Sequence, residues 1–528
     1  MGNAGLVNQP ASPPPGYVVV IPTLGRPCLQ ACVSALAAAA GPLPGQVVLV
    51  DDRRDTPLAL PVTVPPRLAG RLSVLTLEGR GPAAARNAGW RAAQPAPWVV
   101  FLDDDVQVGP RWADELAADL AGLPPEVAAV QGRISVPRPA GRKPTDWERG
   151  TIGLETAQWI TADMACRRDA LVDAGGFDER FPRAFREDSD LALRLLDLGW
   201  TLRRGDRRTS HPVRPAGPGA SLRAQAGNAD DAAMAALHGR DWRQRAGAGA
   251  GRRPAHLAAC ALAAGSLGLL AARQRRAAAL AAAGWLGMTA QFAVARIRPG
   301  PRTLREITVM AATSVVIPPL AAAHWAAGRR RWRGAAPWPP RPKAVLFDRD
   351  GTLIRDVPYN GDPRLVEPMP GAAAALARLR SAGVATAVVS NQSGIARGLL
   401  TSAQVTAVNA RVDALVGPFG AWAVCPHGPA DGCDCRKPAP GLVLTAAAAL
   451  GVEPADCVVI GDIGADVAAA RAAGARPVLV PTAQTRPGEL SGVPAAATLR
   501  EAVLAVLDGR RLPSWQRHRD RDESPATI

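Results

Sequence analysis

The sequence predicts an α/β protein in which two α/β domains flank a helical middle region. Three observations support this fold class. Short apolar runs that end on acidic residues alternate with helical segments towards both ends of the chain, which indicates parallel sheets. The 528 residues are too many for one hydrophobic core and predict roughly three domains. The middle is rich in alanine, leucine and arginine, which favours packed or membrane-associated helices.

The positive charge of the chain is concentrated in this middle region. The formal net charge is +16, and between Arg243 and Lys343 the only acidic residue is Glu306. A basic and apolar helical region is typical of proteins that contact an anionic membrane surface. We find no RNA-binding or DNA-binding motif in the sequence, so we expect no nucleic-acid partner.

The 8 cysteines do not have the pattern of a secreted disulfide framework. Five lie in separate apolar or helical contexts, whereas Cys425, Cys433 and Cys435 cluster beside His427. This distribution indicates a reducing compartment and one metal site. Residues 1–16 are polar and Pro-rich, so we expect a disordered N-terminus without a signal peptide.

The first catalytic domain is predicted over residues 17–227. Helices alternate with four predicted strands, which cover residues 17–21, 46–50, 72–77 and 98–102. The second strand leads into Asp51 and Asp52, and the fourth into Asp103, Asp104 and Asp105. Carboxyl ends of parallel strands meet in one crevice, and adjacent acids there require a neutralising cation. Because Mg²⁺ and Mn²⁺ prefer carboxylate and phosphate oxygens, we expect one of these ions to bind both the acids and a diphosphate.

A further acidic pair, Glu187 and Asp188, stands at the start of an amphipathic helix that is predicted over residues 191–198. Taken alone, these acids are equally well explained as helix N-terminal residues that complement the macrodipole.

Five motifs that follow one another along the chain favour a functional role for these acids. They are Val-Val-Val-Ile-Pro-Thr, Val-Asp-Asp, Ala-Arg-Asn-x-Gly, Leu-Asp-Asp-Asp, and Gly-Gly-Phe-Asp-Glu followed by Glu-Asp. Over about residues 17–215 the chain thus resembles the family 2 GT-A glycosyltransferases. The resemblance implies a nucleotide-sugar donor and inversion at the anomeric carbon. It also assigns three roles: Asp51 and Asp52 near the base and ribose, Asp103 and Asp105 as the Mg²⁺ or Mn²⁺ site, and Asp188 as the base that deprotonates the acceptor.

The chain departs from this family at one place. After Asp52 the family usually has Gly-Ser, whereas here Arg53 and Arg54 follow, which affects the predicted base and ribose contacts. His211 stands where some relatives supply another metal ligand; the competing interpretation is a solvated loop histidine.

The middle region, residues 228–334, begins with a polar helix predicted over 228–245 and a Gly-rich hinge. Three apolar stretches follow, at residues 257–272, 277–295 and 307–327. A membrane span needs about 20 apolar residues, so we expect the second and third to qualify and the first to be too short. Alanine is only weakly lipophilic, and packed soluble helices are therefore the alternative.

The expected substrates indicate how these helices are arranged. Phosphorylated and nucleotide-linked substrates are cytosolic, so both catalytic domains require an even number of crossings. Two spans, or a hairpin lying in the membrane, would place both domains at the cytoplasmic face. The alternative is a basic helical collar that only rests on lipid. Residues 335–342 are then a stiff Pro-rich linker.

The second catalytic domain is predicted over residues 343–510. Its first strand, 344–347, leads into Asp348 and Asp350, two carboxylates that repel unless they share a cation or a proton. Gly351 allows a sharp turn, and Thr352 offers a hydroxyl and a backbone N–H to an anion. A surface turn is the alternative interpretation of this motif. A later strand, 457–461, leads into Asp462, which would complete a Mg²⁺ site with Asp348 and Asp350.

Two further segments of this domain suit phosphate binding. A strand over 384–389 leads into Ser390 and Asn391, followed by glycines and Arg397, which can cradle a phosphate. The loop after it carries four soft metal ligands, namely Cys425, His427, Cys433 and Cys435. Three thiolates and one imidazole predict a closed, structural zinc site. Zinc would rigidify the loop that aims Arg436 and Lys437 at a phosphate.

In order, these segments resemble the haloacid-dehalogenase (HAD) superfamily, whose core is Rossmannoid. The zinc loop narrows the resemblance to the branch of heptose-1,7-bisphosphate phosphatases and histidinol-phosphatases. It implies that Asp348 is a nucleophile that forms an aspartyl-phosphate, and that Asp350 is the general acid and base. Substrate binding is then assigned to Thr352, Ser390, Asn391, Arg397, Arg436 and Lys437.

The sequence therefore predicts a bifunctional enzyme that joins a sugar transferase to a sugar-bisphosphate phosphatase. We expect a heptose-containing surface glycan or glycolipid as the product, with a glycan or lipid-linked acceptor. One alternative makes the C-terminal domain a histidinol phosphatase. Another makes the N-terminal domain a non-catalytic module that binds sugar nucleotides. Residues 511–528 are charged, and we expect them to be disordered.

Overall fold

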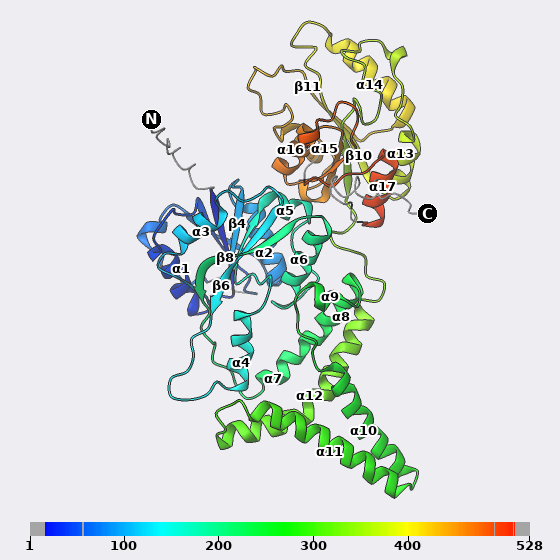
Figure 1. The fold of residues 1–528 in the computed structure, drawn as a ribbon. Helices are drawn as coiled ribbons and strands as arrows, with labels where there is room; N and C mark the ends of the chain where they lie inside the picture. Colours follow the sequence, from blue (N-terminus) through cyan, green and yellow to red (C-terminus); the bar gives the residue numbers. More distant parts are fainter. Residues whose placement is uncertain (1–15, 55–57, 490–491, 511, 513–528) are drawn as a thin grey trace, which may run out of the picture. The chain divides into compact units, whose positions relative to one another are not determined.

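The computed structural model describes residues 16–54, 58–489, 492–510 and 512. Figure 1 shows the helices and strands of the chain, which divides into two compact units. Unit 1 contains the described parts of Met1–Arg168, Leu202–Ala226 and Ala250–Ala323, and unit 2 contains those of Asp169–Thr201, Gly227–Gly249 and His324–Ile528. The expected disordered ends lie outside the described residues, apart from Gly16 and Leu512. The predicted domain boundaries remain predictions.

Unit 1 is built on an eight-stranded sheet with the order β3-β2-β1-β4-β7-β6-β8-β5. The strands are β1 (Tyr17–Thr23), β2 (Gln46–Asp51), β3 (Leu72–Thr76), β4 (Trp98–Leu102), β5 (Gln107–Val108), β6 (Val127–Ser135), β7 (Asp163–Arg167) and β8 (Thr201–Ser210). The four predicted strands are confirmed and run parallel, as β3-β2-β1-β4. Strand β7 pairs antiparallel with both β4 and β6. The sheet is therefore mixed, and its antiparallel half was not predicted.

Helices cover both faces of the parallel half. They are α1 (Cys28–Ala38), α2 (Pro82–Ala92) and α3 (Trp112–Leu120), with the shorter α4 (Asp146–Ile152) and α7 (Ala220–Arg223) elsewhere in the unit. Val19 and Ile21 pack with Leu29 of α1 in one buried core. On the other face α2 approaches so closely that a Cβ on Gly89 would lie 2.4 Å from Val20 Cγ1. Burial on both faces explains why β1 is an uninterrupted apolar run.

Strand β8 was missed because its sequence, with four arginines, lacks an apolar run. Its buried Arg207 donates from Nε to Asp163 Oδ1 (2.8 Å), from Nη1 to Asp119 Oδ2 (3.0 Å) and from Nη2 to the Val130 carbonyl (2.7 Å). A buried charge is tolerated when it is paired and fully hydrogen-bonded. This network therefore lets a polar strand complete the sheet.

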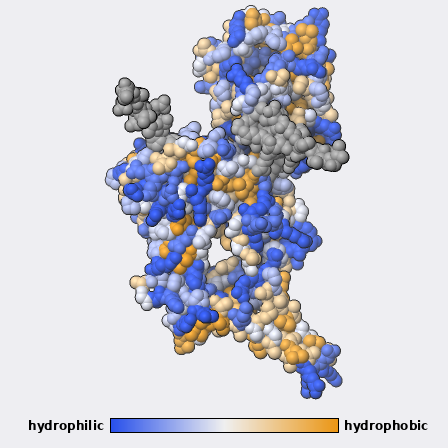
Figure 2. Space-filling model, viewed as in Figure 1, coloured by the Kyte–Doolittle hydropathy of each residue, from blue (hydrophilic) through white to orange (hydrophobic). Residues whose placement is uncertain are grey.

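Three long helices complete unit 1: α10 (Arg253–Ala271), α11 (Arg275–Ile297) and α12 (Leu304–Arg331), the last of which continues into unit 2 after Ala323. Helices α10 and α11 lie side by side (Figure 1). All three are long and apolar enough to cross a membrane. The prediction that the first stretch is too short is wrong, because the helix already begins at Arg253, with Pro254 in its first turn. Figure 2 shows apolar surface over α10 and α11.

Unit 2 contains a five-stranded parallel sheet with the order β11-β10-β9-β12-β13. The strands are β9 (Ala344–Phe347), β10 (Ala385–Asn391), β11 (Ala421–Cys425), β12 (Cys457–Gly461) and β13 (Arg476–Leu479). The predicted strands that lead into Asp348, Ser390 and Asp462 are confirmed as β9, β10 and β12, with β10 extending to Asn391.

Alternate residues of the central strand point into two separate cores. Val345 and Phe347 pack with α13 (Ala372–Ser381), α14 (Ser402–Val416) and α17 (Leu499–Asp508). Ala344 and Leu346 pack with α15 (Gly441–Ala449) and α16 (Gly464–Ala473). The result is a three-layer α/β/α arrangement, as the resemblance implied.

The remaining helices of unit 2 are α6 (Glu187–Asp197), α8 (Gly227–His238), α9 (Trp242–Arg245) and α5 (Arg168–Asp173), which begins in unit 1. The single polar helix predicted over 228–245 is wrong. It is two helices, because the chain turns at Gly239 with a φ of +85°.

Candidate active sites

Asp348 lies at the carboxyl edge of the central strand of unit 2. Strand β9 ends at Phe347 and its neighbour β12 ends at Gly461, so Asp348 and Asp462 follow adjacent strands. Asp466 joins them from the first turn of α16, and ligand atoms of all three carboxylates lie within 4.8 Å of one another. We call Asp348, Asp462 and Asp466 the acid cluster. Gly351, with a φ of +78°, passes so close that a Cβ would lie 2.3 Å from Asp462 Oδ2.

Lys437 is buried against the acid cluster. Its Nζ donates to Asp348 Oδ1 and Asp466 Oδ1, each at 2.6 Å, and to the Val389 carbonyl at 3.0 Å. Burial opposes the charge of this lysine, but the two carboxylates outweigh burial, and the pKa of Lys437 is raised. The site therefore holds a fixed positive charge beside Asp348.

One lysine does not neutralise three carboxylates. Burial, with the neighbouring acids, raises the pKa of Asp348 well above its ordinary value. Burial and then Asp466 raise the pKa of Asp462 to about 6. The raised pKa values reflect the electrostatic repulsion between buried carboxylates. A bound divalent cation would offset this repulsion. The oxygen-only donor set fits Mg²⁺.

Asp350 points towards different partners. Its carboxylate accepts hydrogen bonds from Gln392 Nε2 (2.9 Å) and from Arg349 Nη2 (3.0 Å). Arg349 is buried and held by Asn409 Oδ1 at 2.8 Å. Asp350 was predicted as a Mg²⁺ ligand together with Asp348 and Asp462, whereas the carboxylate grouped with those two is that of Asp466. Its fixed position beside the pocket suits an acid and base.

A pocket of about 360 Å³ opens at this site. Five predicted residues line it, namely Asp348, Asp350, Asn391, Lys437 and Asp462, together with Tyr359 and Gln484, which were not predicted. Asn391 holds the Lys437 backbone with both amide atoms, each at 3.1 Å.

The other predicted substrate-binding residues of this domain, Thr352, Ser390, Arg397 and Arg436, are not among the residues that line this pocket. Thr352 and Ser390 are buried. Arg397 donates to the Tyr359 hydroxyl at 2.6 Å, and Arg436 donates to the His427 carbonyl at 3.2 Å. Arg436 thus supports the zinc loop in this structure.

The four predicted zinc ligands come together in unit 2. Ligand atoms of Cys425, His427, Cys433 and Cys435 all lie within 4.8 Å of one another. The Sγ atom of Cys435 is 3.3 Å from that of Cys425 and 3.5 Å from that of Cys433. Zn–S bonds of about 2.3 Å in a tetrahedron give S–S separations of about 3.8 Å, so the cluster fits zinc with little adjustment.

Replacing Cys435 by serine should remove zinc from the protein and also lower phosphate release. The ligand set becomes incomplete, and the loop that positions Lys437 loses its constraint. Zinc content by plasma mass spectrometry should fall from about one ion per chain to near zero. Cys28→Ser, in α1 of unit 1, should keep the ion. Full zinc content in Cys435→Ser would contradict the assignment.

The acids after β4 form the candidate metal site of unit 1. Ligand atoms of Asp103, Asp105 and His211 lie within 4.8 Å of one another. Burial raises the pKa of Asp105, with Asp103 adding to the rise. Oδ1 of Asp105 is buried and, among the described residues, makes no hydrogen bond; His211 Nε2 is 3.7 Å away. A donor set of two carboxylates and one imidazole fits Mn²⁺ or Mg²⁺.

Asp104, between the two predicted ligands, is engaged elsewhere. It accepts hydrogen bonds from Thr23 Oγ1 (2.7 Å) and Arg26 Nη1 (3.1 Å). Arg214, not predicted, places its Nε 2.6 Å from Asp105 Oδ2. His211 is buried, so the interpretation as a solvated loop histidine is wrong.

The two acids after β2 have separate partners. Arg53 folds back onto Asp51 and donates from Nε (2.8 Å) and Nη2 (2.7 Å) to its two carboxylate oxygens, which lowers the pKa of Asp51. Asp52 accepts the backbone N–H groups of Arg80 (2.7 Å) and Gly81 (2.8 Å). The departure from the family pattern at Arg53 thus places a cation on the acid that was assigned to base and ribose binding.

Asp188 belongs to unit 2, as the second residue of α6, and is half-buried. The helix is anchored by Asp190, which accepts from His238 Nε2 (2.7 Å) and Arg194 Nε (2.8 Å). The role of Asp188 as the acceptor base remains a prediction.

Comparison with known proteins identifies both regions. The glycosyl transferase family 2 model matches residues 18–170, and the HAD-hydrolase-like model matches residues 434–505. The D-glycero-beta-D-manno-heptose-1,7-bisphosphate 7-phosphatase of Pseudomonas putida is 38% identical over 173 residues, which cover 31% of this chain and 97% of the relative. The protein of the same name from Pseudomonas aeruginosa is 43% identical over 143 residues, which cover 26% of this chain and 80% of the relative.

A crystal structure of D,D-heptose 1,7-bisphosphate phosphatase from B. bronchiseptica, complexed with magnesium and phosphate, is 33% identical and covers 32% of this chain and 99% of that chain, with a TM-score of 0.29. The chain thus carries a family 2 glycosyltransferase domain at its N-terminus and belongs, through its HAD-like C-terminal domain, to the family of the D-glycero-beta-D-manno-heptose-1,7-bisphosphate 7-phosphatases.

Proposed function

We propose that the HAD-like domain hydrolyses a sugar bisphosphate, with D-glycero-D-manno-heptose 1,7-bisphosphate as its substrate. The observation that carries this proposal is the buried Lys437, which bridges Asp348 and Asp466 and lines the pocket together with Asp348. A fixed cation between a candidate nucleophile and a second acid serves the binding of a phosphoryl group. The substrate itself is inferred from the names of the relatives.

In the proposed reaction, an Asp348 carboxylate oxygen attacks phosphorus as the bond from phosphorus to the sugar oxygen breaks. Asp350 donates a proton to the leaving oxygen and then takes one from the water that releases phosphate from the aspartyl-phosphate. Ser390 and Lys437 stabilise the phosphoryl oxygens. Mg²⁺, held by Asp348 and Asp462 beside Asp350 and Asp466, would neutralise the transferring group when bound.

The choice between the two candidate substrates can be tested by phosphate release from a panel. The full chain should hydrolyse heptose 1,7-bisphosphate, in one or both anomers, with a kcat/KM at least about 100-fold above that for histidinol phosphate. Differences of this size arise where polar groups of a site lose their partners. A preference for histidinol phosphate would overturn the heptose assignment and separate the two domains functionally.

We further propose that the N-terminal domain transfers a sugar from a nucleotide-sugar donor, with inversion, to a glycan or a lipid-linked acceptor. Asp103, Asp105 and His211 are placed to hold Mn²⁺ or Mg²⁺, which would bind the donor diphosphate. Asp188 would deprotonate the acceptor hydroxyl, whose oxygen then attacks the anomeric carbon as the nucleoside diphosphate leaves.

The alternative is a domain that binds nucleotide sugars without turning them over. The contact between Arg53 and Asp51 supports it, because a predicted donor contact is already satisfied within the protein. Metal-dependent hydrolysis or transfer of a nucleotide sugar, lost on removal of Asp105, would exclude this alternative.

We propose that α10, α11 and α12 hold the protein at the cytoplasmic face of a membrane. The support is apolar helix surface that the protein leaves exposed: only 6% of the apolar windows of α10 and α11 are buried. After expression in a bacterial host, the chain should sediment with the membrane fraction and stay there through an alkaline carbonate wash. Release by the wash would favour a collar resting on lipid, and a soluble chain would contradict the proposal.

A further inference from the structure

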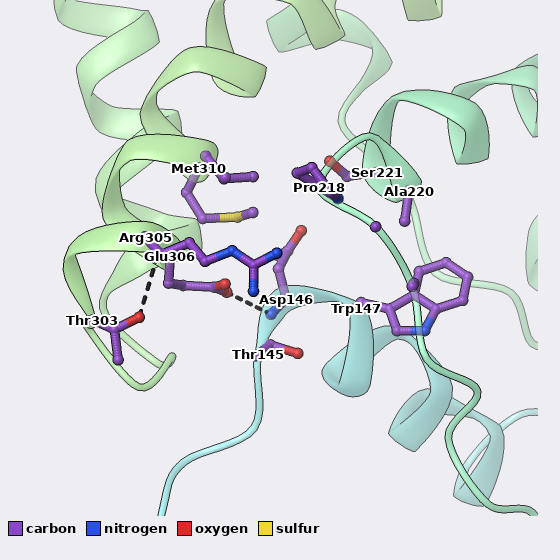
Figure 3. A pocket seen from close by; sticks show the side chains of 13 residues that line it. Thr145, Asp146, Trp147, Pro218, Ala220, Ser221, Thr303, Arg305, Glu306 and Met310 are labelled. Carbon is purple, nitrogen blue, oxygen red and sulfur yellow. Dashed lines mark hydrogen bonds between the residues drawn. The ribbon is translucent and has the colours of Figure 1, made fainter.

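A second cavity, distinct from the phosphatase pocket, lies in unit 1 where α12 begins beside α4 (Figure 3). Its volume is about 180 Å³. The first turns of α12 contribute Arg305 and Met310, the segment before and within α7 contributes Pro218 and Ser221, and α4 contributes Trp147. The lining therefore combines apolar and polar side chains.

Two polar groups of this cavity have no partner within the described part of the chain. The guanidinium of Arg305 makes no hydrogen bond or ion pair there, although the side chain extends from α12 towards Asp146 (Figure 3). The hydroxyl of Ser221 is buried and unpaired there. Buried polar groups are normally satisfied, so the unpaired Ser221 hydroxyl points to a ligand, and the exposed Arg305 that lines the same cavity favours an anionic one.

The acids of the cavity do not cancel this cation. The Asp146 carboxylate is held by Arg149 Nη2 (3.0 Å) and Arg296 Nη2 (2.8 Å). Glu306 Oε1 accepts the Asp146 backbone N–H at 2.9 Å. Three guanidinium groups, including that of Arg305, therefore face two carboxylates, which leaves one positive charge. Arg305 is the group that is free to meet a ligand.

The cavity is joined directly to the metal site of unit 1. Arg214 places its Nε 2.6 Å from Asp105 Oδ2, and its carbonyl accepts the indole N–H of Trp147 at 2.8 Å. Two residues beyond Arg214, the same segment begins to line the cavity, which it does from Ala216 to Ser221. One short segment, residues 214–221, therefore contacts the candidate metal site at Arg214 and lines the cavity further along. The donor diphosphate is expected at that metal site.

The cavity also lies at the boundary of the apolar helices. Arg305 stands in the first turn of α12, a helix apolar enough to cross a membrane. Leu304 and Ile307, on either side of it, are 79% and 37% exposed. Basic residues that flank an apolar helix lie at the depth of lipid headgroups.

We propose that this cavity binds the phosphate group of a membrane lipid, and that this lipid is the acceptor of the transferase. Arg305 and Ser221 contact the phosphate, and the apolar side chains of Met310 and Pro218 contact the first part of the lipid chain. The acceptor role rests on the proposed transferase function, whereas the lipid site itself does not.

Binding can be counted by native mass spectrometry of the full chain in a non-ionic detergent, with hexadecyl phosphate as the probe. The Asp348→Asn background prevents the phosphatase domain from hydrolysing the probe. One adduct sensitive to position 305 is expected, because removing a charged hydrogen-bond donor weakens binding roughly tenfold or more. Arg305→Gln should therefore show at least this loss. Arg302→Gln, whose guanidinium only donates to the Arg298 carbonyl, should bind the probe like the parent.

Two further probes separate the sources of the phosphate. Hexadecanol, which lacks the anion, and inorganic phosphate, which lacks the chain, should each bind at least tenfold more weakly than hexadecyl phosphate. Equal binding of inorganic phosphate would show a site for a free anion and overturn the lipid assignment. Unchanged binding in Arg305→Gln would overturn the site.

A failure of the proposed transferase activity can be distinguished from a failure of the lipid-phosphate site. Asp105→Ala should lose nucleotide-sugar turnover and keep the Arg305-dependent adduct. If the parent chain binds the lipid phosphate but turns over no nucleotide sugar, the acceptor role is overturned while the lipid site stands.

Discussion

Replacing Asp348 by asparagine should lower phosphate release from the sugar bisphosphate by roughly 10⁴-fold or more, because loss of a catalytic nucleophile removes the whole covalent route. The substitution keeps the size and shape of the side chain and still offers an oxygen to Lys437 Nζ, which now lies 2.6 Å from the carboxylate. The amide cannot attack phosphorus. Initial rates of phosphate release at saturating Mg²⁺, with wild type and variant purified identically, measure the loss.

The matched control is Asp362→Asn. Asp362 is paired with the exposed Arg364 in the loop after the pocket-lining residue Asn360, and the phosphate-release rate should stay within a factor of about two. Intact-protein mass spectrometry after an acid quench should show a phosphorylated fraction in wild type and none in Asp348→Asn. A variant that retains more than a few per cent of the wild-type rate would contradict the role of Asp348 as the nucleophile.

Replacing Asp105 by alanine should reduce nucleotide-sugar turnover by at least about 100-fold. Residues that only support a metal ligand already contribute 10- to 100-fold, so loss of a direct ligand costs at least as much. His211→Ala should be affected less, since His211 Nε2 is 3.7 Å from Asp105 Oδ1 and two carboxylates would remain. Release of nucleoside diphosphate in the presence of Mn²⁺ is the readout.

Asp206→Asn provides the control for this variant. Asp206 is an exposed acid of β8 that pairs with Arg133, outside the metal site, and its replacement should leave turnover unchanged. If wild type shows no metal-dependent turnover, the domain is a binding module. Full activity in Asp105→Ala would instead place the metal elsewhere.

The parts of the fold that the sequence predicted are those with local signals. Strands β1, β4, β9 and β12 are apolar runs because both of their faces are buried in hydrophobic cores. Strand β8 carries no such signal, since its buried side chains, Arg207 and Thr209, are polar and their partner Asp163 lies on another strand. Pairing between distant polar residues is a property of the folded chain, and periodicity does not reveal it.

The same distinction applies to the sites. The convergence of Asp348 with Asp462, the contact of Lys437 with Asp348, and the Cys/His cluster were predictable because these residues stand at strand ends or in a short loop with diagnostic spacing. Asp466 follows Asp462 by four residues, and that spacing, one turn into α16, was the signal that it belonged to the cluster. Gln392, Arg349 and Arg214 were missed because their contacts with Asp350, Asn409 and Asp105, respectively, join residues far apart in the sequence.

The sequence shows that Arg53 stands where the family usually has glycine, and this departure predicts altered contacts to the base and ribose of the donor. That the guanidinium closes on the carboxylate of Asp51, two residues before it, depends on how the chain turns after β2.

One chain is expected to contain two independent catalytic centres. Assaying both activities on the same purified variants tests this expectation most directly. Wild type should release phosphate from heptose 1,7-bisphosphate and turn over a nucleotide sugar. Asp348→Asn should lose only the first activity and Asp105→Ala only the second, each keeping the other within about twofold, since the two residues belong to separate compact units and share no partner among the described residues. Loss of both activities from either single substitution, or the absence of either activity from wild type, would contradict the account.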